Sequence, residues 1–205
     1  MQLMDVAAIG MRMHSGWGAL VVISGDPPYI EVRDRRRIVI TDSQTPGAKQ
    51  PFHFAAQMER PESEQYLRNC AAISEDLAVA AIRNVVQELK SRRYRITGSA
   101  IMLASGHPLP ALSEILASHA LIHSAEGEFF RNAVWKACQR LNLPITGFRE
   151  RDLNDQAGAA FGKTAPDVQR RIATLRNSVG SPWTEDYKKA SLAACIILRN
   201  HGNGS

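Results

Sequence analysis

The helical segment around residue 120 carries the side chains whose spacing is best suited to chemistry. His119, His123 and Glu126 stand at positions i, i+4 and i+7, which places them on one face of a helix. Two imidazoles at this spacing can chelate a transition metal, with the carboxylate as a third ligand. The pattern is not HExxH, and polar residues on the exposed side of a helix explain the same letters. A metal site and a solvated polar face therefore both stay open.

An acid–base site without metal is a second use of the same helix. His123, Glu126 and Glu128 are its residues that could act as a general acid or base. They would need the fold to bring them close to Asp186 and Ser105. Ser105 has no nucleophile signature such as GxSxG, so covalent catalysis is not indicated.

Basic residues gather in two further segments, and either segment could contact phosphate. The first segment is β-like and contains Arg33, Arg35, Arg36 and Arg37. The second covers the end of a helix and the approach to the next strand, and it contains Lys90, Arg92, Arg93 and Arg95. A net charge of +5 and a pI near 9.4 permit an anionic partner but do not prove one. A structural explanation is also open, because Arg92 and Arg93 would complement a helix dipole and the strand arginines would protect a sheet edge.

The first half of the chain predicts a small sheet followed by one long helix. Three antiparallel strands are predicted near 6–13, 17–24 and 29–41, separated by turns at 15–16 and 25–28. A loop is expected at 45–51. From Pro61 to Lys90, apolar residues recur at helical spacing and predict a long amphipathic helix.

The second half predicts alternating strands and helices. The expected elements are a strand at 96–104, a helix at 112–141 that breaks near Ser118, a strand at 143–148, and a last helix from about Thr184 to about Asn200. Residues 149–165 are expected to form a loop because they hold Gly158 and Gly162. A helix should then begin at Thr164, with Pro166 and Asp167 in its first turn.

Length and composition indicate a single globular unit. With 205 residues and 44% hydrophobic content, we expect one domain at 1–200 and a frayed tail at 201–205. No apolar run approaches the ~18 residues that span a bilayer, and the N-terminus does not resemble a signal peptide, so a cytoplasmic protein without a membrane partner is expected. Cys70, Cys138 and Cys195 predict buried, reduced thiols. No cofactor is expected, with a divalent metal as the alternative, and the oligomeric state stays open.

The predicted order of elements, and three segments in particular, resemble RuvC-type resolvases of the ribonuclease H-like superfamily. Residues 9–19, with Ile9-Gly10-Met11-Arg12 and Gly16-Trp17-Gly18-Ala19, resemble the family's Ile-Gly-Ile-Asp strand and the strand after it. Residues 126–145, especially Ala133, Ala137, Leu143 and Pro144, resemble a helix of RuvC-like resolvases and the strand that follows it. Residues 182–194 resemble the family's terminal Asp-Ala-Ala-Asp-Ala-Leu helix. The resemblance implies an α/β fold with a five-stranded mixed sheet, three strands antiparallel and two parallel, flanked by helices.

The resemblance also implies a nuclease site, most of whose carboxylates are missing here. Such enzymes hold two divalent metals between several carboxylates, and the metals activate water against a phosphodiester. The first-strand acid falls on Arg12, and the acid of the fourth strand falls near Ala104 or Ser105. The acids of the last helix fall on Asp186 and Lys189. If Arg12, Asp186 and Lys189 meet, we expect an ion-paired cluster without metal, since two cations repel Mg²⁺. Otherwise Asp186 only favours the helix dipole and Lys189 is solvated.

Two functional hypotheses follow. The first is a non-catalytic protein of ribonuclease H-like fold that binds nucleic acid or a partner protein; its candidate binding residues are Arg12, Lys189, Ser105, Arg35, Arg36, Arg37, Arg92 and Arg93. The second is a nuclease or phosphoester hydrolase whose metal or acid–base residues have moved to Asp186, Glu126, Glu128 and His123. We prefer the first, because comparison with the family's pattern shows the loss of carboxylates directly, whereas their relocation is a conjecture.

Overall fold

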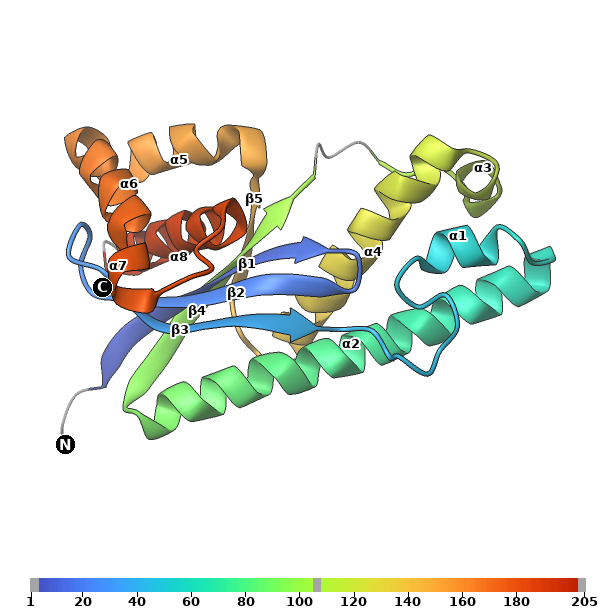
Figure 1. The fold of residues 1–205 in the computed structure, drawn as a ribbon, viewed down its shortest axis with the longest axis horizontal. Coiled ribbons are helices and arrows are strands. Elements are labelled where there is room, and N and C mark those ends of the chain that lie inside the picture. Colours follow the sequence, from blue (N-terminus) through green and yellow to red (C-terminus); the bar gives the residue numbers. More distant parts are fainter. Residues whose placement is uncertain (1–3, 105–107, 203–205) are drawn as a thin grey trace.

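A five-stranded mixed sheet forms the centre of the molecule, as expected. The computed structural model describes residues 4–104 and 108–202. The strands are β1 Asp5–His14, β2 Trp17–Ser24, β3 Glu31–Val39, β4 Tyr94–Leu103 and β5 Ile145–Arg149, in the sheet order β3-β2-β1-β4-β5. β1, β2 and β3 pair antiparallel, and β4 and β5 extend the sheet in parallel on the side of β1 (Figure 1).

Helices cover both faces of this sheet (Figure 1). They are α1 Pro51–Ala55, α2 Arg60–Ser91, α3 Leu112–Leu116, α4 His119–Arg140, α5 Leu153–Phe161, α6 Ala165–Thr174, α7 Arg176–Val179 and α8 Glu185–Gly202, with the short 3-10 turns η1 Glu150–Asp152 and η2 Gly162–Thr164. α2 and α4 pack on one face, and α8 packs on the other with α5 and α6 outside it. In the described parts of the chain, no helix has both the length and the apolar character to cross a membrane.

The central strands are apolar on both sides because each face lies under helices. Successive side chains of a strand point to opposite faces, so Ile9 and Met11 join the core beneath α2 and α4, whereas Ala8 joins the core beneath α8. β3 is an edge strand and carries mostly charged residues. The three cysteines are buried and free, as predicted.

α8 lies directly against β1, and Gly10 makes this approach possible. A Cβ atom on Gly10 would overlap the carbonyl oxygen of Ala190 in α8. Gly158, in the middle of α5, has nothing within 4 Å of such a Cβ. The two glycines therefore form a matched pair for testing this packing.

We expect Gly10→Ala to destabilise the protein by about 3 kcal/mol or more, because the backbone of α8 must move to accommodate the methyl group. Gly158→Ala should instead stabilise by roughly 0.5–1 kcal/mol, since alanine is the better helix former where space is open. Urea unfolding of both variants measures this. Equal effects of the two substitutions would show that α8 does not depend on the close contact with β1.

Two local predictions were wrong, and the last helix extends slightly further than expected. Residues 149–165 are mostly helical, because Leu153, Ala157 and Phe161 bury one face of α5 at four-residue intervals and this burial overrides Gly158. Pro51 begins helix α1 and does not end a loop, as proline suits a first helical turn. The last helix continues to Gly202, and residues 203–205 of the predicted tail lie outside the described residues.

Candidate functional site

Three elements meet where β1 ends. Arg12 and His14 are two residues apart on β1 and so project from the same face of the sheet. α8 begins beside them and carries Asp186 in its first turn and Lys189 three residues later, on the same side of the helix. Glu150 follows directly after β5, at the start of η1. We call these five residues the ion-pair cluster.

The carboxylates of this cluster are held by its basic groups. Arg12 pairs with Asp186 Oδ1 through one guanidinium nitrogen and donates to Glu150 Oε2 through another, at 3.0 Å. Nε2 of His14 lies 3.0 Å from Asp186 Oδ2, and Nζ of Lys189 pairs with Glu150 Oε1. Arg12, Asp186 and Lys189 therefore do converge and form ion pairs, with Glu150 bridging the two cations.

The cluster is partly shielded from water, which strengthens its interactions. The side chains of Arg12 and Asp186 are 24% and 19% exposed. Burial alone would lower the pKa of Arg12, but hydrogen bonds and charge interactions with Glu150 and Asp186 outweigh it, and the pKa is raised. The pKa of Glu150 is lowered, mainly by its hydrogen bond with Lys189 and further by Arg12, against the opposing effect of burial.

The lowered pKa of Glu150 predicts a loss of stability in acid. Because the folded-state pKa lies below the ordinary value of 4.5, the contribution is present above about pH 4.5 and is lost as the pH falls through the folded-state value. The melting temperature of Glu150→Gln should lie below that of the native protein near neutral pH, and the difference should shrink below about pH 4.5. A difference that stays constant from pH 7 to pH 3 would contradict this assignment. Arg36 lowers the pKa of Glu88 in the same way, but Glu88 is present in both proteins, so its contribution to acid stability cancels in the comparison.

Comparison with known structures identifies the architecture. No protein family model matches the chain, and no curated protein matches its sequence significantly. The structure of Thermus thermophilus RuvC in complex with a Holliday junction substrate superposes with a TM-score of 0.57 at 11% identity, covering 98% of this chain and 97% of that one. A second Thermus thermophilus RuvC structure gives 0.55 at 12% identity, covering 97% and 96%. The chain has a RuvC-like ribonuclease H fold.

The two metals that a RuvC-like site implies do not fit the residues of this ion-pair cluster. Each oxygen of Asp186 and of Glu150 already faces a nitrogen of Arg12, His14 or Lys189. Arg12 and Lys189 stand where the resemblance places two metal-binding acids, and their charges balance the two carboxylates that are present. A divalent cation would have to displace ion pairs and then lie beside two fixed positive charges.

Sequence reasoning missed His14 and Glu150. The period of two along a strand could have indicated His14, because it follows Arg12 by two residues. No local pattern pointed to Glu150, which comes at the start of a segment expected to be a loop. Ser105, predicted near this site, lies outside the described residues.

The candidates on α4 lie away from the ion-pair cluster, since α4 packs on the sheet face opposite to α8. His119 and His123 are close together, with ring centroids 4.4 Å apart. His53 of α1 joins them, with ring centroids 5.3 and 4.8 Å from theirs. Glu126 is buried and accepts a hydrogen bond from Nδ1 of His53 at 2.9 Å. The structure thus replaces Glu126 by His53 as the third member of the predicted metal-binding group.

Glu128, the remaining candidate of this helix, points elsewhere. Its carboxylate pairs with Arg131 at 3.2 Å, one turn along α4. This is an ordinary helical i, i+3 ion pair. The structure therefore brings Glu128 together neither with the histidines nor with Asp186.

The two basic segments come together at the opposite end of β1 from Arg12. Tyr94 lies at their centre, with the guanidinium carbons of Arg33 and Arg92 5.0 and 5.9 Å from its ring centroid. Arg92 also donates to the backbone oxygen of Arg33 at 2.8 Å. We call this group the basic corner; it comprises Arg33, Lys90, Arg92, Arg93 and Arg95. A pocket of about 540 Å³ opens beside it, and Lys90, Tyr94 and Arg95 contribute to its lining.

The other three arginines of the β3 run interact largely within the protein. Arg36 pairs with Glu88 of α2, and the guanidinium carbon of Arg37 lies 4.0 Å from the ring centroid of Trp17. Arg35 donates to the backbone oxygens of Gly180 and Pro182. Arg92 is the C-cap of α2, consistent with the structural explanation for that residue. Within the basic corner, Arg33 and Arg92 lie against Tyr94, whereas Lys90 and Arg95 are exposed and line the pocket.

Proposed function

We propose that this protein binds DNA without cleaving it, as a ribonuclease H-like domain in which ion pairs replace the metal-binding acids. The observation that carries the proposal is the ion-pair cluster. Every carboxylate oxygen of Asp186 and Glu150 is engaged by a cation or an imidazole, so a metal would have to displace these ion pairs to be ligated by either acid. Without the metals, the fold has no means in this cluster to activate water against a phosphodiester.

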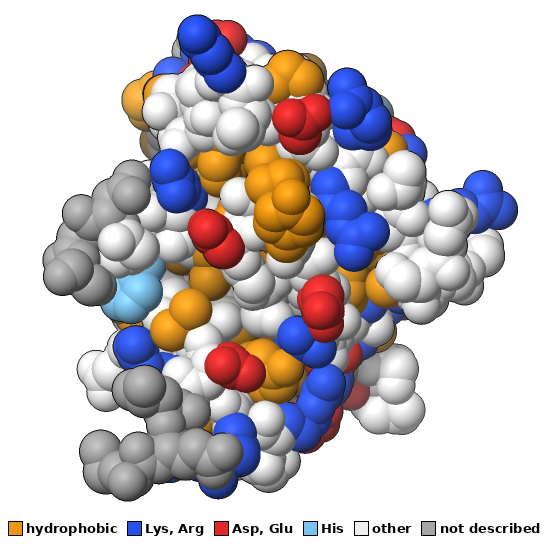
Figure 2. Space-filling model, turned by 90° about the vertical axis from the view of Figure 1, so that its left-hand side faces the viewer, with side chains coloured by type: hydrophobic (Ala, Val, Ile, Leu, Met, Phe, Trp, Pro, Cys, Tyr) orange, Lys and Arg blue, Asp and Glu red, His pale blue; other side chains and the backbone are white. Residues whose placement is uncertain are grey.

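The choice of DNA as the partner has two supports. The similar Thermus thermophilus structure was solved with a Holliday junction substrate, and the match extends over nearly the whole of both chains. The basic corner supplies exposed cations, and Lys90 and Arg95 line a pocket there that can receive a phosphate. Figure 2, which looks onto this end of the molecule, shows Lys and Arg side chains interspersed with acidic and apolar ones. Binding through such a mixed surface should be weak, electrostatic and independent of base sequence.

Fluorescence anisotropy with labelled junction, duplex and single-stranded DNA at ~50 mM salt tests binding, and the same substrates incubated with Mg²⁺ or Mn²⁺ test cleavage. We expect binding without cleavage. If no DNA form binds, the proposal of DNA binding fails and binding of a partner protein is the hypothesis that survives. Cleavage that is lost in Asp186→Asn would refute the non-catalytic proposal in favour of a hydrolase.

A further inference from the structure

We propose that His53, His119 and His123 bind a transition metal ion of the Zn²⁺ class, and that Glu126 orients His53 for this purpose. These residues belong to α1 and α4, whereas α8, with Asp186 and Lys189, covers the opposite face of the sheet. The proposal is therefore independent of the ion-pair cluster and of DNA binding.

The three imidazoles already lie close to the geometry of a metal site. One nitrogen of each can be chosen so that all three lie within 4.8 Å of one another. Zn–N bonds of about 2.0–2.1 Å in tetrahedral geometry require nitrogens about 3.3 Å apart. His119 and His123 are exposed, so rotation of their side chains can close the remaining gap. The i, i+4 spacing on α4 brings these two rings to the same side of the helix.

Glu126 provides the second, independent observation. Its side chain is 3% exposed, and a carboxylate this deeply buried needs hydrogen-bond donors. One oxygen, Oε1, accepts from both Nδ1 of His53, at 2.9 Å, and the backbone nitrogen of His53, at 3.2 Å. Because a carboxylate only accepts, Nδ1 of His53 carries the proton of this bond, and in the neutral imidazole the lone pair of Nε2 is then left for a metal. A carboxylate behind a ligating histidine is the usual second layer of a zinc site.

The chemistry of the ligands sets the class of metal. Three neutral imidazoles suit Zn²⁺, Co²⁺, Ni²⁺ or Cu²⁺, whereas Mg²⁺ and Ca²⁺ prefer oxygen ligands. Three protein ligands leave the fourth position to water or to an incoming group.

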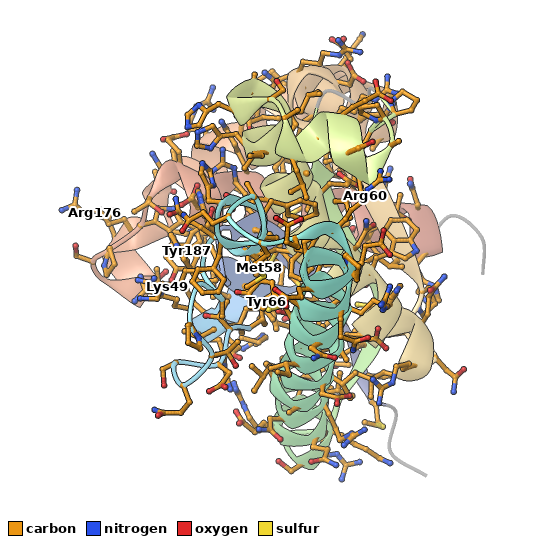
Figure 3. All side chains as sticks on the ribbon, turned by 90° about the vertical axis from the view of Figure 1, so that its right-hand side faces the viewer. Lys49, Met58, Arg60, Tyr66, Arg176 and Tyr187 are labelled. Atoms are coloured by element: carbon orange, nitrogen blue, oxygen red, sulfur yellow. The ribbon has the colours of Figure 1, made fainter. Side chains whose placement is uncertain are left out.

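A bound ion would also fasten a weakly held part of the fold. α1 has only five residues, and beneath it lies a small apolar cluster with three buried members, Ile115, Ile122 and Ala125. Figure 1 shows α1 beside α3 and the start of α4, and Figure 3 faces this end of the molecule, where Met58 and Arg60 mark the connection from α1 to α2. A metal that joins His53 to His119 and His123 would link α1 to α4 across a long stretch of chain. Metal binding should therefore raise the melting temperature.

Calorimetric titration of the full chain with Zn²⁺ in chelator-treated buffer tests the site. We expect one Zn²⁺ per chain with a rise in melting temperature, and intense visible absorption of tetrahedral Co²⁺ when Co²⁺ replaces it. His123→Ala should abolish this binding. Glu126→Gln keeps the shape of the side chain and all three ligands, and should weaken Zn²⁺ binding roughly 10- to 100-fold.

His201→Gln is the control, because it removes a potential ligand outside the site and should leave Zn²⁺ affinity unchanged. The absence of saturable Zn²⁺ binding, or equal affinity in the native protein and in His123→Ala, would overturn the proposal. Equal affinity in Glu126→Gln would overturn the role given to Glu126. The Co²⁺ spectrum provides a test in the native protein even if a substituted protein fails to fold.

Discussion

The double variant Arg12→Asp, Lys189→Asp is expected to bind Mn²⁺, whereas the native protein is not. The two substitutions would turn a balanced set of charges into four neighbouring carboxylates, including those of Glu150 and Asp186. Two unit charges ~4 Å apart interact by roughly 4 kcal/mol at an effective dielectric constant of ~20. The residues of the cluster are partly exposed, so water reduces this interaction energy. Reversing two charges therefore converts a cluster whose acids and cations balance into one with a net negative charge that attracts a divalent cation.

Calorimetric titration with Mn²⁺ at moderate ionic strength measures this difference. Without metal, the carboxylates of the double variant repel one another, so its melting temperature should fall in chelator and recover when Mn²⁺ is added. Arg151→Asp, Lys188→Asp is the matched control, since it makes the same change of charge on neighbouring residues outside the predicted acid positions. Tight Mn²⁺ binding by the native protein that disappears in Asp186→Asn would show the interpretation of the ion-pair cluster to be wrong.

The second large effect is expected in the salt dependence of DNA binding. If Lys90 and Arg95 each neutralise a phosphate of a duplex, replacing both with serine should reduce the slope of log K against log salt by about 1.8, at about 0.9 per phosphate. When the salt concentration rises from 50 to 200 mM, the affinity of the variant for DNA should therefore fall by roughly tenfold less than that of the native protein. The melting temperature should change little, because exposed charges contribute little to stability.

Lys163→Ser, Arg176→Ser is the control for this experiment. It removes the same charge from exposed positions beside α6, which packs with α8 on the sheet face opposite to α2. Anisotropy titrations at several salt concentrations should give the native slope for this variant. If both double variants change the slope equally, the effect comes from overall charge and the basic corner is not the contact surface.

Much of the architecture could be predicted from the sequence because periodicity depends on local chain geometry. β-Branched and apolar residues between turn signals in the first forty residues placed β1, β2 and β3, and helical spacing placed α2 within one residue at each end. The break at Ser118 was also correct. The prediction of a loop at 149–165 was wrong because the low helix propensity of glycine was given more weight than burial. Burial of Leu153 and Phe161 in the core around α8 makes this segment helical.

The sequence by itself determined that Arg12 and Lys189 stand at positions where the resemblance implies acids, and that His119 and His123 share a helical face. Only the tertiary structure decided which groups complete these sites. Glu150 is 138 residues from Arg12, and Glu126 is 73 residues from His53, yet each pair is joined by a hydrogen bond. Side-chain periodicity extends only along one helix or strand, whereas these partners lie on different elements. Packing of those elements against the sheet brings the partners together, and no local pattern encodes it.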